Sequence, residues 1–285
     1  MLGVSPNTLR SWERRFGYPS PRRSEGGHRQ FELAEIEALR QAFEETQNIS
    51  SAISIARERG AGVGSPGGLR GAFEAFDQER ADRLLEASLA VRSVERTVQS
   101  MLLPAVASLQ DESGLRGVAP EYGFAWRYAT GWLAAALRVA PPATREQGVA
   151  IFDASRPPDI DALHIQALEL FLRRAGVRVL ALPFELHAAR LSNALRALRP
   201  GAAVLSGGHA SLNELGRLVY AVRQGSGEGV EIVDYRGALP DTGASTITRL
   251  GSEPLAAAQM LLEHAYSAKP TVAASPWNMR TVSNE

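Results

Sequence analysis

The spacing of apolar residues divides the chain into a helical front part and a back part in which short strands alternate with helices. Between Leu69 and Val139, apolar side chains recur every three or four residues, and no strand-like alternation interrupts them. We expect three or four helices here, separated by breaks at Ser93, residues 111–117 and Pro120. Helices of this length, joined by short breaks, favour an antiparallel bundle.

From Gly148 onward the period changes. Five short runs rich in aliphatic and β-branched residues are predicted as strands, and they read GVAIFD, VRVLAL, AAVLSGG, VEIVDY and TITRLG. Helical segments lie between or after them, at residues 161–175, 185–198, 209–223 and 253–267. Strands that alternate with helices predict a parallel sheet covered on both faces, as in flavodoxin-like (Rossmann-like) or response-regulator-like domains. Ligands in such folds bind beyond the carboxyl ends of the strands, here in the loops at residues 153–164, 183–187, 206–210 and 234–245.

Three further helices are predicted before the bundle. The first begins after Ser5, whose side chain can cap it, and stops at Gly17. Pro6 suits the first position of this helix, because the backbone N–H that proline lacks would have no partner within the helix there. The apolar residues of this helix share one face: Leu9, Trp12 and Phe16. The second helix carries apolar residues at helical spacing: Leu33, Ile36, Leu39 and Phe43. The third begins near Asn48 or Ser50.

The length and composition indicate a multidomain globular protein. A chain of 285 residues, 45% of them apolar, can fill two or three cores. Residues 60–68, GAGVGSPGG, have the composition of a flexible linker. We therefore divide the chain into a first domain, this linker, a helical bundle, an α/β domain and a flexible tail: residues 1–59, 60–68, 69–142, 148–268 and 269–285.

Positive charge gathers near the N-terminus of a chain whose formal net charge is zero. Residues 10–29 hold six arginines against two glutamates, a local net charge of +4. The polar residues of the first helix lie on the face opposite its apolar residues: Asn7, Arg10, Ser11, Arg14 and Arg15. Such a face can contact the phosphates and base edges of DNA. The alternative interpretation is an arginine-rich surface that is only exposed to solvent.

Several motifs in this stretch are specific: TLR at residues 8–10, WERRFG at residues 12–17, Pro19, Pro21 and GGHR at residues 26–29. Together they resemble the MerR family of winged helix-turn-helix transcription regulators, in the branch that includes the CarA and CarH photoreceptor regulators. The resemblance implies that the first segment is a recognition helix and that the Pro/Arg/Gly run is the wing. Family members carry a further helix before this point, so we expect the first helix of the motif to be truncated.

The resemblance also implies a partner and a set of contacts. Double-stranded promoter DNA would be bound by a dimer or tetramer of the chain, with Trp12 and Phe16 mostly in the core. The implied DNA-binding residues are Asn7, Thr8, Arg10, Ser11, Arg14, Arg15, Arg22, Arg23, His28 and Arg29.

Composition excludes several classes of site. The sequence contains no cysteine, which excludes disulfides and cysteine-based metal sites. Its five histidines are scattered, without an HExxH or His-x-His motif, so nothing favours a zinc enzyme. Because no run approaches the roughly 20 apolar residues of a membrane span and no signal-peptide pattern opens the chain, we expect no membrane association and a cytoplasmic protein.

In domain order, the bundle and the α/β domain resemble the cap and the cobalamin-binding domain of the same branch. Such domains use Asp-x-His-x-x-Gly after the first strand, where the histidine ligates cobalt and the aspartate orients it. Here ALHIQA at residues 162–167 keeps His164, and Asp161 is one residue too near to serve as that aspartate. Ser206 remains from a Ser-x-Leu motif, whereas Tyr235 and Arg236 replace a late Gly-Gly pair and would fill the space of the nucleotide tail.

We therefore expect a degenerate motif and no cobalamin. The alternative is that cobalamin binds, with His164 as the cobalt ligand and Ser206 beside it. The tryptophan and histidine of the family cap are missing, and Trp126 and Trp132 are expected in the core. If the α/β domain binds a different planar or apolar effector, four residues are candidates for the lining of its pocket: Tyr122, Trp126, His164 and Tyr235.

Three functions follow from these observations. The leading hypothesis is a DNA-binding transcription regulator, not an enzyme, whose sensor domain descends from a cobalamin module. The second is a light-responsive regulator that still binds cobalamin or another chromophore. The third is a cobalamin-dependent methyl-carrier enzyme, against which the arginine-rich first domain and the lack of an acid/base pair or nucleophile constellation count.

Overall fold

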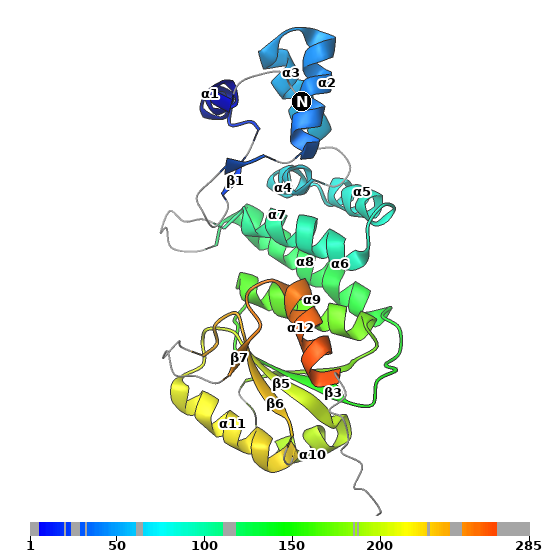
Figure 1. Cartoon of the computed structure of the whole chain (residues 1–285), viewed down its shortest axis with the longest axis vertical. Helices are drawn as coiled ribbons and strands as arrows, with labels where there is room; N and C mark the ends of the chain where they lie inside the picture. The colour runs from blue at the N-terminus through cyan, green and yellow to red at the C-terminus, as the bar shows by residue number, and fades with distance from the viewer. Residues whose placement is uncertain are drawn as a thin grey trace, which may run out of the picture.

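The computed structural model describes residues 6–19, 21–23, 29–31, 33–60, 65–110, 118–184, 186, 188–226, 229–239 and 247–266. Four expectations from the sequence lie outside these residues: the Ser5 cap, His28 in the wing, the break at residues 111–117 and the tail at residues 269–285. Figure 1 shows three tiers, with the N-terminal elements at the top, the helical bundle in the middle and the sheet at the bottom.

The N-terminal tier contains α1 (Pro6–Phe16), β1 (Arg22–Arg23), β2 (Arg29–Gln30), α2 (Leu33–Thr46) and α3 (Ile49–Gly60). Helix α1 stops where the sequence predicts, because Gly17 has φ 63° and its amide donates to the Glu13 carbonyl at 2.7 Å. The amide of Ser50 donates to Asn48 Oδ1 at 2.9 Å, which caps α3. The small core of this tier is formed by Tyr18, Leu39, Ala42, Ala52, Ile53 and Ala56.

The bundle contains α4 (Pro66–Glu74), α5 (Gln78–Leu89), α6 (Val94–Thr97), a π-helical turn (Val98–Leu102), α7 (Leu103–Ala107) and α8 (Pro120–Arg138). The predicted linker over residues 60–68 extended too far. Ser65 accepts a hydrogen bond from the Gly68 amide at 3.2 Å and α4 begins at Pro66, so the last three residues of that segment are helical. The π turn directly precedes α7, whose second residue is Pro104, and the ring of this proline would clash with the carbonyl four residues back in a regular α-helix.

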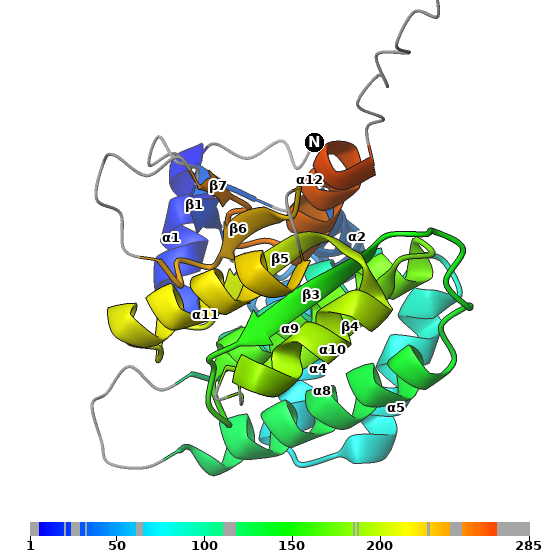
Figure 2. The same cartoon turned by 90° about the horizontal axis from the view of Figure 1, so that it is seen from below.

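The sheet contains β3 (Gly148–Asp153), β4 (Arg178–Pro183), β5 (Pro200–Ser206), β6 (Glu231–Tyr235) and β7 (Thr248–Arg249). These strands are all parallel in the order β4-β3-β5-β6-β7, which confirms the flavodoxin-like prediction. The helices are α9 (Ile160–Arg174), α10 (Ala188–Leu198), α11 (Leu212–Ser226) and α12 (Pro254–Tyr266). Figures 1 and 2 show α10 and α11 on the face of the sheet that is turned away from the bundle.

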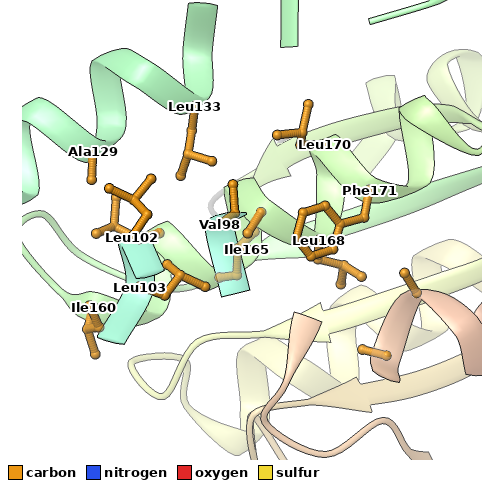
Figure 3. Close-up of a cluster of buried hydrophobic side chains, with 14 of the residues drawn as sticks. Val98, Leu102, Leu103, Ala129, Leu133, Ile160, Ile165, Leu168, Leu170 and Phe171 are labelled. Atoms are coloured by element: carbon orange, nitrogen blue, oxygen red, sulfur yellow. The ribbon is translucent and has the colours of Figure 1, made fainter. Parts of the chain in front are cut away.

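One continuous core joins the bundle to the sheet. Residues from α4 to α8 belong to the same buried cluster as α9, α12 and the facing side of β3 and β5. Figure 3 shows Leu133 of α8 and Val98 of the π turn directed toward Ile165 of α9. The bundle is therefore packed directly on the α/β unit. Within the described residues, no helix is long and apolar enough to cross a membrane.

Candidate functional site

The exposed face of α1 carries the predicted DNA-contacting residues. Trp12 and Phe16 are half-buried and pack against the core of the first tier. The opposite face exposes its polar residues: Arg10, Ser11, Arg14 and Arg15. The Arg15 guanidinium lies 5.2 Å from the centroid of the Phe16 ring. The helix is thus amphipathic, with its basic side turned to solvent.

A two-stranded antiparallel ribbon follows α1 at the place expected of the wing. Arg22 lies opposite Gln30, and Arg23 lies opposite Arg29. The backbone therefore brings three arginines onto one short ribbon. Among the predicted contacts, Thr8 is half-buried, whereas the side chains of Asn7, Arg22, Arg23 and Arg29, and all of His28, lie outside the described part of the chain.

The second candidate site lies at the carboxyl ends of the strands, beneath α8. His164 is the fifth residue of α9 and is 8% exposed. Arg236 follows β6 directly, and its guanidinium reaches across to α9. Its Nε donates to Asp161 Oδ1 at 2.6 Å, and its Nη1 donates to the Ser252 carbonyl at 2.8 Å and lies 3.2 Å from His164 Nδ1.

The chemistry of arginine fixes the state of this histidine. A guanidinium has no acceptor, so His164 Nδ1 must accept from Arg236 and the ring proton must sit on Nε2. Burial, together with the positive charge of Arg236, lowers the pKa of His164 to about 3, although a backbone hydrogen bond at Ser252 opposes the shift. The imidazole is therefore neutral, and neither ring nitrogen offers a free lone pair to a metal ion.

The backbone of Arg236 has the left-handed conformation that is common for glycine and rare for residues with a side chain. Its φ is 59°, in the left-handed region, and the following Gly237 has φ 73°. Tyr235 before it is fully buried, and its hydroxyl donates to the Ser252 carbonyl at 3.3 Å. Two large side chains thus lie side by side in the chain at the end of β6.

Helix α8 contacts the loop at the second candidate site. The Tyr122 hydroxyl donates to the Pro158 carbonyl at 2.6 Å, and Trp126 Nε1 donates to the Asp159 carbonyl at 2.9 Å. Both acceptors belong to the loop between β3 and α9. The bundle therefore contacts this loop through direct hydrogen bonds.

Comparisons with known proteins agree with the resemblance seen in the sequence. The profile of the MerR family regulatory protein matches residues 1–31. The HTH-type transcriptional repressor CarA of Myxococcus xanthus is 30% identical over 230 residues, which cover 72% of this chain and 73% of CarA. The chain belongs to the MerR family of transcriptional regulators.

Other relatives support the same assignment. The repressor CarH of Myxococcus xanthus is 28% identical over 223 residues, which cover 70% of this MerR-family chain and 73% of CarH. The regulator MlrA of Escherichia coli is 47% identical over 41 residues, 14% of this chain and 17% of MlrA. These relatives are regulators of transcription, and none of their names describes an enzyme.

A solved structure supports the fold of the rear part. The Methanosarcina barkeri monomethylamine corrinoid protein matches 70% of this MerR-family chain and 97% of its own, with a TM-score of 0.50 and 15% sequence identity. At that identity the match concerns the fold: a helical bundle followed by a flavodoxin-like sheet.

Two residues singled out from the sequence of this MerR-family regulator have structural partners. The Ser206 hydroxyl is buried and donates to the Phe152 carbonyl at 3.0 Å, so it ties β5 to β3. Trp126 packs against the core, as expected, and its indole also donates to the Asp159 carbonyl in the loop after β3. The sequence had no local signal for the pairing of Arg236 with Asp161, because the two residues are 75 positions apart.

Proposed function

We propose that this regulator binds double-stranded promoter DNA through α1 and the β1–β2 ribbon, and that it does so as a dimer or tetramer. The observation that carries the proposal is the segregation of α1 into a packed aromatic face and an exposed face with Arg10, Arg14 and Arg15. The contacts are those implied by the family motifs, with the arginines of the ribbon on phosphates beside the groove. Two relatives are named repressors, which supports occlusion of a promoter as the mode of action.

A gel shift tests the DNA-binding part. The full chain is titrated onto the promoter region neighbouring its own gene and onto an unrelated fragment of the same length. We expect a retarded band with the first fragment, and loss of that band when Arg10 and Arg14 are both replaced by Ala. Arg83→Ala removes an exposed arginine of α5 and should leave the band unchanged. Equal loss with both variants would refute the assignment of α1.

We further propose that the α/β unit works without cobalamin, and the residues at the family site do not fit the cofactor. A cobalt ligand needs a free imidazole nitrogen, whereas His164 Nδ1 accepts from Arg236 and its Nε2 carries the proton. The nucleotide tail needs space beside β6, where Tyr235 is fully buried and the Arg236 guanidinium is bonded to Asp161. The family site is filled by this chain's own side chains.

Corrin absorbance tests this second part separately from DNA binding. The purified full chain is incubated in the dark with adenosylcobalamin and desalted, and its visible spectrum is recorded. We expect no retained corrin absorbance. A stoichiometric corrin spectrum, together with an elution volume that changes on illumination, would instead support the light-responsive alternative.

A further inference from the structure

An open groove lies between α5 and α8, on a different side of α8 from the contacts with the β3–α9 loop. One wall is a stripe of aromatic residues that recur every fourth position of α8: Phe124, Tyr128 and Trp132. Gln78 and Asp82 of α5 form the other wall. The groove holds about 500 Å³, within the roughly 300–1,000 Å³ range of small-molecule sites.

The polar groups of the groove are arranged around one carboxylate. The Tyr128 hydroxyl donates to Asp82 Oδ1 at 2.6 Å. Burial, this hydrogen bond to Asp82, and the charges of Asp82 and Glu86 together raise the pKa of Tyr128, so the phenol stays a donor. A carboxylate has room for several donors, so Asp82 can accept a further hydrogen bond from a molecule in the groove.

Charge in and beside the groove favours a cation. Asp82 is half-buried, and Glu86, which is exposed, lies one helical turn further along α5 and acts on the same tyrosine. Arg127 is the basic residue of the lining, and it is exposed. Water and salt screen an exposed charge more strongly than a half-buried one, so within the groove the charge of Asp82 outweighs that of Arg127.

The floor of the groove leaves room for a ligand. Gly131 of α8 is exposed, and a Cβ added there would meet no atom within 4 Å. We propose that the groove binds a small organic cation with a flat aromatic body, whose ammonium group faces Asp82 and whose ring lies among Phe124, Tyr128 and Trp132. Aromatic rings attract both the apolar body and the positive head of such a molecule.

Benzylammonium is the probe, and its binding to the full chain is followed by the indole signals of ¹⁵N-tryptophan in NMR titrations. We expect the Trp132 indole signal to shift with saturation, and benzoate, which has the same size and the opposite charge, to cause no such shift. Absence of saturation with benzylammonium at millimolar concentrations, or equal binding of benzoate, would overturn the proposal.

Two pairs of variants locate the site. Asp82→Asn should weaken benzylammonium binding about tenfold, whereas Glu79→Gln removes an exposed charge of the same helix and should change the affinity less than about twofold. Gly131→Leu fills the groove without removing a side chain and should abolish binding. Gly216→Leu is its control, because Gly216 is also an exposed helical glycine with no atom within 4 Å of an added Cβ. Equal effects within either pair would place the probe elsewhere and refute the assignment.

Discussion

Arg236 and His164 are 72 residues apart in the chain, yet the Nη1 atom of the arginine lies 3.2 Å from the Nδ1 atom of the histidine. The contact joins the end of β6 to the first turns of α9, and Asp161 and the Ser252 carbonyl complete it. It uses the one histidine that the family motif would assign to a metal. The Arg236–His164 contact is thus part of an internal hydrogen-bond network that links β6, α9 and Ser252.

Arg236→Gly should lower the free energy of unfolding by about 1–3 kcal/mol, because it removes charge-assisted hydrogen bonds to Asp161 and Ser252 from a half-buried position. Relief of the left-handed backbone at φ 59° offsets only part of this loss. Urea unfolding of the full chain, followed by circular dichroism, measures the change.

Arg199→Gly is the matched control for that substitution. Arg199 also has a left-handed backbone, with φ 50°, but its side chain is exposed. We expect a change within about 1 kcal/mol in either direction, since only backbone effects remain. If both variants lost equal stability, the hydrogen-bond network around Arg236 would contribute nothing to the stability of the folded chain.

The depressed pKa of His164 makes stability depend on pH. The folded protein holds this imidazole neutral down to a pKa of about 3, whereas an unfolded histidine binds a proton near pH 6.5. The unfolded state therefore gains a proton first, and the contribution of His164 is complete above about pH 6.5 and declines as pH falls from there toward about 3.

His164→Asn tests this pH dependence. The asparagine side-chain oxygen can still accept from Arg236, but the residue does not titrate. Between about pH 7.5 and about pH 5, the free energy of unfolding should fall more in the unmodified chain than in the variant. Parallel pH profiles for the two proteins would show that His164 is not held neutral in the folded state.

The secondary structure could be predicted because each element has its own periodic signal. The run GVAIFD coincides with β3, Gly148–Asp153, and Gly17 ends α1 as expected. The error at the linker has a physical reason: Ser65 and Pro66 form a cap and a first helical position, but the glycines that follow resemble a flexible segment. A capping signal outweighed composition there.

The sequence points to the residues of the candidate site but not to the hydrogen bonds that connect them. The bulk of Tyr235 and Arg236 is visible in the sequence, whereas the burial of Tyr235 and the bond from Arg236 to Asp161 are visible only in the structure. That Arg236 would turn toward His164 depends on its left-handed φ and on the tertiary approach of α9, neither of which leaves a local pattern. The core position of Trp126 is predicted correctly, but an indole at helical spacing gives no sign of a distant carbonyl acceptor.

Tyr122→Phe should weaken the seating of the bundle on the sheet. The substitution keeps the ring and removes the hydroxyl that donates to the Pro158 carbonyl at 2.6 Å, which costs about 1 kcal/mol. Tyr220→Phe removes an equivalent hydroxyl from an exposed site on α11, and we expect no change in stability there. Thermal unfolding of both variants measures the difference, and equal midpoints would mean that the Tyr122 hydrogen bond does not hold the two parts together.

Replacing Arg14 should change the salt dependence of DNA binding as well as the affinity. Each phosphate contact contributes about 0.9 to the slope of log K against log salt, so Arg14→Ala should flatten the slope by about that amount for each bound chain. Arg14 is exposed on the basic face of α1, whereas Arg83, equally charged, is 66% exposed on α5 in the bundle. Fluorescence anisotropy with a labelled operator fragment, repeated over a series of salt concentrations, gives both slopes. An unchanged slope for Arg14→Ala, or the same flattening for Arg83→Ala, would mean that the outer face of α1 does not lie against the phosphate backbone.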